Sequence, residues 1–267
     1  MVFEQFLEAK TINKHFTYVM LLGFFYVILS NILSKLFFKL EDNSLTNIFL
    51  VTIFLIPSIY MILKKEEKND SKKGTKHFFT NHKYLIKTYF GLFIGLFIGF
   101  LFLNYYYPHT MNYQLNILKS RGDITSSLDL IKSNFNLQDT FGYISANTTV
   151  ILIAFILSLF YGAGAIFLLI LNASIFSTYI IYLFNDLNTF KVFIAMIHMI
   201  PEIFGFFIAI ISGGIISIAL MSEKFHSDRF NNILKDSIIL LIISLSIIIL
   251  SAIIETTIKY LFINYIL

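Results

Sequence analysis

Residues 145 to 184 contain no charged side chain, and this run is the feature that most constrains the fold. As one continuous helix it would be about 60 Å long, twice the ~30 Å hydrocarbon core of a membrane. The run must therefore fold back or lie partly along the membrane surface, and Gly162-Ala163-Gly164 is the natural break point. We predict a tight hairpin that crosses the membrane twice. A re-entrant arrangement of 145–184 is the alternative that the sequence leaves open.

The chain as a whole is strongly apolar: 57% of the 267 residues are hydrophobic and only 13% are charged, whereas soluble domains have about 25% charged residues. These apolar runs are continuous, which predicts helices, because barrel strands alternate in polarity. Further runs of about membrane length lie at 16–40, 45–63, 85–107, 190–221 and 238–262. We predict an all-α, polytopic transmembrane helical bundle of six to seven spans. It forms a single integral membrane domain over 1–267, with the first three spans in 1–107.

The charged residues predict how the chain is oriented. The segment 64–87 is strongly basic, which places it on the cytoplasmic side by the positive-inside rule. The N-terminus is then cytoplasmic and the acidic turn 41–44 external, in a multi-pass protein of the cell membrane. The loop 222–236, with Lys224, Arg229 and Lys235, is cytoplasmic only if 145–184 crosses twice.

The segment 108–144 is the one long external connection in this topology. Pro108 ends the third span, and Tyr105, Tyr106 and Tyr107 before it form an interfacial aromatic cluster. Apolar residues then recur at loosely helical spacing, as at Leu115 and Leu118, and again over 128–135. We predict short amphipathic helices that lie at the outer surface.

Small residues at four-residue spacing mark helix-packing faces, because they let two membrane helices approach closely. The predicted positions are Gly91, Gly95 and Gly99 in the third span, Gly162 and Gly164 at the hairpin, and Gly205, Ala209, Gly213 and Ser217 further on. We expect the first set to pack within the chain, with a homodimer seam as the alternative.

Polar residues at membrane depth are costly, from roughly 2.5 kcal/mol upward for a charge, so they normally face the bundle interior and pair. His198 and Glu202 are four residues apart and share one helix face, with Pro201 between them predicting a kink or break. We predict one buried polar cluster, whose members are His198, Glu202, Glu255, Asn147 and Asn172. For Glu255 the alternative is a pair with Lys259.

The residue types in the chain favour a structural role over catalysis or metal binding. The chain has no cysteine, and only His198 among its histidines lies well inside a span, so we expect no metal, no cofactor and no catalytic residue. The leading hypothesis is a non-enzymatic membrane scaffold or complex subunit. A small-solute or ion transporter that uses His198 and Glu202 comes second, and an intramembrane hydrolase third. Expected partners are the lipid bilayer and other membrane proteins or a second copy, but no nucleic acid.

Four segments, in this order, resemble the stage II sporulation protein M family. They are "FGYISANTTV" at 141–150, "GAGAIFLLILNAS" at 162–174, "HMIPEIFGFFIAIISGG" at 198–214 and "SAIIE" at 251–255. The segment 1–107, with its basic loop, also looks like archaeal members, and 145–267 resembles the family core. The chain differs from the family pattern where Asn172-Ala173 replaces Asn-Gly and where Met199 replaces the glycine of Pro-His-Gly.

The resemblance implies a polytopic membrane protein in which all five polar residues of the predicted cluster occupy family positions. Family members in spore formers belong to a membrane complex that acts with cell-wall remodelling partners during engulfment. For most members the biochemical activity is unassigned, so the resemblance implies a fold and a membrane location without a reaction.

Overall fold

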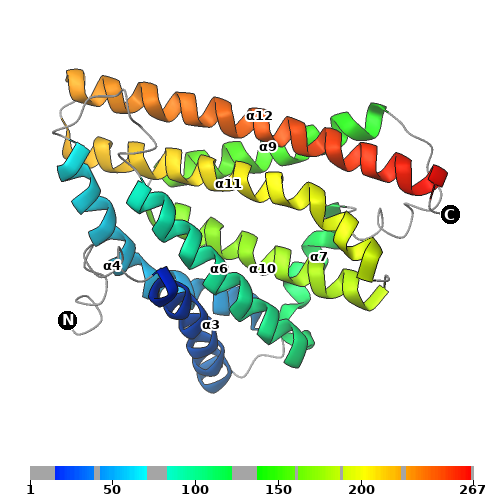
Figure 1. Ribbon diagram of the computed structural model, residues 1–267. Coiled ribbons are helices and arrows are strands. Elements are labelled where there is room, and N and C mark those ends of the chain that lie inside the picture. Colours follow the sequence, from blue (N-terminus) through cyan, green and yellow to red (C-terminus); the bar gives the residue numbers. More distant parts are fainter. Residues whose placement is uncertain are drawn as a thin grey trace.

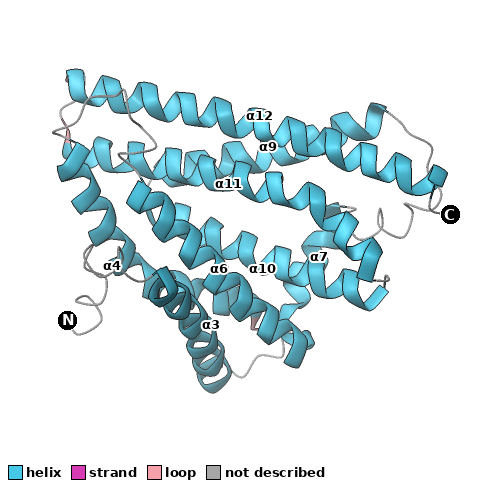
Figure 2. Ribbon diagram, viewed as in Figure 1, coloured by secondary structure: helices cyan, strands magenta, loops and turns pink. Residues whose placement is uncertain are grey.

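The computed structural model describes residues 16–38, 43–70, 83–121, 137–159, 162–186, 189–223 and 227–265. These ranges contain helices and no strand, which confirms the all-α prediction (Figure 2). In chain order the elements are α3 (Phe16–Phe38), α4 (Ser44–Asp70), α6 (Lys83–Tyr106), η2 (Pro108–Met111), α7 (Asn112–Arg121), α9 (Leu137–Leu159), α10 (Gly162–Asp186), α11 (Thr189–Ser222) and α12 (Asp228–Tyr265).

Six of the described helices are long and apolar enough to cross a membrane. They are α3, α6, α9, α10, α11 and α12, and a shorter apolar segment, Ser44–Pro57, begins α4. This agrees with the predicted bundle of six to seven spans. The uncharged run 145–184 forms two helices, since α9 ends at Leu159 and α10 begins at Gly162, the first glycine of the predicted break.

Several helices extend further than the sequence predicts. The helix α4 continues for 13 residues beyond Pro57, and α9 starts at Leu137, ahead of the expected 145. The helix α12 starts at Asp228 because Ser227 caps it: the Phe230 N–H donates to Ser227 Oγ at 3.1 Å. The first backbone N–H groups of a helix have no partner within the helix, and an N-cap side chain accepts a hydrogen bond from one of them. The helix can therefore begin in the polar residues that precede the apolar run.

A kink or a break was predicted at Pro201. The helix α11 continues through Pro201 without interruption, so the break is wrong and the kink stays a prediction. A proline removes one backbone donor, but neighbouring helices and flanking turns tolerate this in membrane helices. In the segment 108–144, α7 confirms one short amphipathic helix: Gln114 and Leu118 are buried, whereas Tyr113 and Lys119 are exposed. The second predicted stretch, 128–135, lies outside the described residues.

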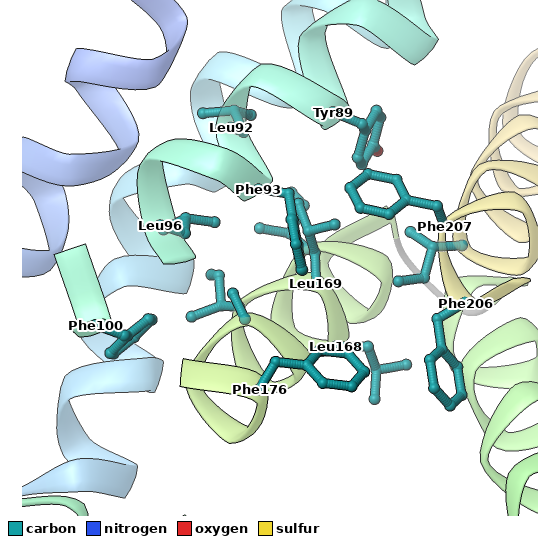
Figure 3. Close-up of a cluster of buried hydrophobic side chains, with 14 of the residues drawn as sticks. Tyr89, Leu92, Phe93, Leu96, Phe100, Leu168, Leu169, Phe176, Phe206 and Phe207 are labelled. Atoms are coloured by element: carbon teal, nitrogen blue, oxygen red, sulfur yellow. The ribbon is translucent and has the colours of Figure 1, made fainter. Parts of the chain in front are cut away.

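The helices form two groups joined by α10 (Figure 1). On one side α12 runs beside α11 along most of its length, with α9 against both. On the other side α3 packs against α6 and α4. The helix α10 contacts α6 and α4 as well as α9 and α11, and α7 lies against it. Figure 3 shows side chains of α6, α10 and α11 pointing toward one another in the core, with Phe93 and Phe207 edge to face at 4.9 Å.

The contact between α3 and α6 depends on glycine. A Cβ atom added at Gly95 would clash with the Met20 backbone, and one at Gly99 would lie 2.9 Å from Val27 Cβ. Gly23 on α3 is equally close, at 2.9 Å, to the Leu92 carbonyl oxygen. The glycines therefore let the two backbones touch, as small residues do between membrane helices.

Candidate functional site: polar groups between the membrane helices

The residues of the predicted polar cluster lie on four helices that contact one another. Asn147 is on α9, Asn172 on α10, His198 and Glu202 on α11, and Glu255 on α12. Asn172 is only 6% exposed, whereas Asn147, Glu202 and Glu255 are half-buried. The two carboxylates each interact with another group. The side chain of His198 lies outside what the structure describes, so its part in the cluster stays a prediction.

Two hydrogen bonds define how α11 and α12 align. The Ser244 hydroxyl of α12 donates to the Gly205 carbonyl of α11 at 2.7 Å. The Ser212 hydroxyl of α11 donates to the Ser237 carbonyl of α12 at 2.6 Å. From the first bond to the second, the position on α11 advances by seven residues, from Gly205 to Ser212. The position on α12 goes back by seven residues, from Ser244 to Ser237. The two helices are therefore antiparallel with a heptad register, as in a coiled coil.

This register places the ionisable positions in successive layers. Position 198 of α11 is one heptad before Gly205, so it lies opposite Ser251, which is one heptad after Ser244 on α12. In the neighbouring layer, Glu202 of α11 lies beside Ile248 of α12. Glu255 lies one heptad beyond Ile248 and is therefore opposite position 195. The two carboxylate positions are thus separated by about 10 Å along the helix axis, with position 198 between them. The register predicts a ladder of polar groups along the α11–α12 seam.

One of the predicted packing positions of α11, Gly205, lies on this same seam. A Cβ atom added at Gly205 would lie 2.9 Å from Ile248 Cγ1, and Gly205, Ala209, Gly213 and Ser217 are all buried. Gly162 and Gly164 lie in the first turn of α10, and their surroundings are outside the described part of the chain.

A second set of buried polar groups joins α10 to the helices on its other side. The Asn104 amide of α6 donates to Thr178 Oγ1 at 2.8 Å. The Gln114 amide of α7 donates to Ser174 Oγ at 3.2 Å. All four side chains are at most 4% exposed. These bonds tie the short helix α7 and the end of α6 to the middle of α10.

The sequence reasoning missed the neutral polar residues that make these bonds, because it gave most weight to ionisable groups. A signal was present: Ser237, Ser244 and Ser251 recur at seven-residue spacing on α12, and all three are at most 1% exposed. On α10, Ser174, Ser177 and Thr178 follow Asn172 within two turns of an otherwise apolar helix.

The chemistry available to these groups is mainly hydrogen bonding. Hydroxyls and amides predominate, and the described residues contain no group of three or more His, Cys, Asp or Glu able to hold a metal ion. The hydroxyls donate to backbone carbonyls across the seam, so they act as helix-to-helix links. In model membrane proteins such links contribute on average about 0.6 kcal/mol each.

Comparison with known families agrees with this arrangement of helices. Residues 88–258 match the family of stage II sporulation protein M, and this range is well over half of the 267 residues. The chain belongs to this family. The match runs from the start of α6 into α12, so it covers all five residues of the predicted polar cluster. It begins well before residue 145, where the part resembling the family core was expected to start. No curated protein and no solved structure gives a significant match.

Proposed function

We propose that this member of the stage II sporulation protein M family is a non-enzymatic membrane scaffold or complex subunit. One observation carries the proposal: several buried polar side chains of the membrane helices form hydrogen bonds from one helix to another. Ser212 and Ser244 join α11 to α12, and Asn104 joins α6 to α10. Glu202 and Glu255 fall in separate layers of the seam, which favours a structural ladder over a single reaction centre.

A transporter is the second candidate, and it too is supported by a specific observation. Asn172 Nδ2 and Gln114 Oε1 are buried and have no hydrogen-bond partner among the described residues. Buried polar groups on helices beside a break in the chain, such as the one before Gly162 of α10, are features of solute pathways. A transporter with these groups would use Glu202 and His198 as its ionisable pair.

Glu202→Gln separates the two functions. If the protein is a scaffold, wild type and Glu202→Gln in liposomes have the same proton permeability under an imposed membrane potential, measured with an enclosed pH-sensitive dye. The expected change is instead a loss of thermal stability, because the amide replaces a half-buried carboxylate that interacts within the bundle. Asp228→Asn, which changes an exposed carboxylate in the first turn of α12, is the matched control and should change both readouts little.

The opposite pattern would rule the scaffold out. A wild-type proton flux that Glu202→Gln abolishes, with thermal stability unaltered, would assign the carboxylate to transport. Native mass spectrometry in a mild detergent adds an independent measure, because a complex subunit extracts as an assembly larger than the 30.9 kDa single chain.

We propose a cell-membrane topology with a cytoplasmic N-terminus, supported by the lysine-rich segment 64–87, which runs from the end of α4 to the start of α6. The chain has no cysteine, so single cysteines report sidedness directly. A cysteine at Ser120, exposed on α7, should react with a membrane-impermeant maleimide added outside intact cells. A cysteine at Arg229 should react only after the cells are opened. Labelling of position 229 in intact cells would contradict the double crossing by α9 and α10.

A further inference from the structure

The C-terminal ends of α3 and α6 carry a lysine and several exposed aromatic side chains that the proposed function does not use. The two helices run in the same direction, because Phe16 lies against Gly91 near their beginnings and Lys35 against Tyr107 near their ends. From Lys87 to Tyr107 the chain rises about 30 Å along α6, which is the thickness of the hydrocarbon core. Lys87 and Tyr107 therefore lie at opposite membrane interfaces, and Lys35 lies at the same interface as Tyr107.

An aromatic ring holds Lys35 at this interface. Its Nζ atom lies 3.8 Å from the centroid of the Tyr107 ring, a cation–π contact between α3 and the residue that follows α6. Both side chains are exposed. The helices α3, α6 and α7 contain no Asp or Glu, so none of the three supplies a counter-charge. An ammonium group has three N–H donors, and those that do not face the ring can bind an anion from outside the chain.

The last turn of α3 is otherwise apolar. Leu36, Phe37 and Phe38 follow Lys35, and each is more than half exposed. Successive residues of a helix point about 100° apart, so these four side chains point to nearly all sides of α3. This turn therefore extends into the lipid, with one positive charge at the level of the headgroups.

A strip of exposed side chains leads from this interface toward the membrane centre. Tyr106, Phe102 and Ile98 are spaced by four residues along α6, so they share one face of the helix, and each is more than 40% exposed. The ring centroid of Phe102 lies 4.6 Å from that of Tyr106 and 6.0 Å from that of Phe24 on α3. The strip is phenolic at the interface and purely apolar below it.

A phospholipid matches both features, because it has a phosphate at the interface and an apolar chain below it. Lysine binds phosphate as a point charge, and a lysine near a membrane surface attracts anionic lipid. An apolar helix of a partner protein would cover the strip but would leave the charge of Lys35 uncompensated. A free anion would pair with Lys35 but would leave the strip uncovered.

We propose that Lys35, positioned by the ring of Tyr107, binds the phosphate of an anionic phospholipid whose acyl chain lies along Phe102 and Ile98. In the proposed topology this lipid belongs to the outer leaflet, opposite the lysine-rich segment 64–87. The inference does not depend on the choice between scaffold and transporter, because either protein would present this surface to lipid.

Quenching of a single tryptophan by brominated lipids tests the proposal, because the chain has no tryptophan of its own. Phe102→Trp places the reporter on the strip, and Ile249→Trp on α12 is the matched control, since both native side chains are 42% exposed. The vesicles contain phosphatidylcholine and phosphatidylglycerol, and the bromine is placed on one lipid or on the other. We expect the reporter in Phe102→Trp to favour phosphatidylglycerol about fivefold, the effect of one lysine near an anionic surface. Ile249→Trp should show no preference.

Substitutions at Lys35 then assign the preference. In the Phe102→Trp background, Lys35→Met removes the charge and should abolish the preference, whereas Lys35→Arg keeps the charge and should retain it. Lys119→Met removes an exposed lysine of α7 and is the control for loss of charge, so it should also retain the preference.

Three results would overturn the proposal. The first is no lipid preference in Phe102→Trp, and its recovery by Glu41→Gln/Asp42→Asn would assign Lys35 to the acidic turn 41–44. The second is a preference that persists in Lys35→Met. The third is weak quenching by both lipids in Phe102→Trp while Ile249→Trp is strongly quenched, which would show that another protein or a second copy covers the strip.

Discussion

Gly95→Ala is expected to lower the free energy of unfolding by about 1–3 kcal/mol, the usual cost of overpacking a core. The added methyl group would press on the carbonyl oxygen, carbonyl carbon and Cα of Met20. These are backbone atoms, so they cannot rotate away as a side chain would, and α3 must shift as a whole. Reversible unfolding in mixed detergent micelles, followed by circular dichroism, measures the change.

Two other glycines provide the comparison. At Gly91 the added Cβ atom would lie 3.0 Å from Cε2 of the Phe16 ring, which can turn, so Gly91→Ala should cost less than Gly95→Ala. At Gly142 on α9 nothing lies within 4 Å, and alanine there should be neutral or stabilising by up to about 1 kcal/mol through helix propensity. Equal effects at Gly95 and Gly142 would show that the α3–α6 contact does not depend on close backbone approach.

Ile248→Ala is expected to destabilise the protein by about 2–5 kcal/mol, the range for truncating a large core side chain. Ile248 is 0% exposed and lies over Gly205 in the α11–α12 seam. The truncation leaves a void beside Gly205, which has no side chain to fill it. Ile249→Ala is the matched control, because Ile249 is 42% exposed on the outer face of the same helix. It should change stability little.

A double-mutant cycle then tests the contact itself. In the wild-type background Gly205→Ala would place a Cβ atom 2.9 Å from Ile248 Cγ1 and is expected to destabilise the seam. In the Ile248→Ala background the same methyl group enters the void, so Gly205→Ala should be neutral or restore stability. Contacting residues show such coupling, whereas distant ones add. Strict additivity would mean that the α11–α12 register inferred from Ser244 and Ser212 is incorrect.

Several parts of the fold could be predicted from the sequence. The uncharged run 145–184 folds into two helices because its length exceeds one membrane crossing, and Gly162 begins the second helix. The glycine series 91, 95 and 99 correctly indicated a helix-packing face, but its partner α3 was not identified. That partner contributes a single glycine, Gly23, whose role depends on the residues it meets.

The candidate site was less predictable for a physical reason. His198 and Glu202 are neighbours on one helix, so local geometry suffices to relate them. Their relation to Glu255 depends on the register between α11 and α12, which the Ser244 and Ser212 hydroxyls define. Sequence spacing alone does not contain that register, and the layers place Glu255 about 10 Å from Glu202 along the axis.

The sequence by itself determined that this chain is a bundle of membrane helices, because the bilayer sets the length and polarity of any segment that crosses it. Those are properties of each segment alone. Only the tertiary structure decided which helices touch and which polar groups are paired. Lipid tails are as apolar as leucine, so helix association in a membrane depends on close packing and on hydrogen bonds between particular neighbours. Gly95 beside Met20, and Ser244 beside Gly205, are such neighbours.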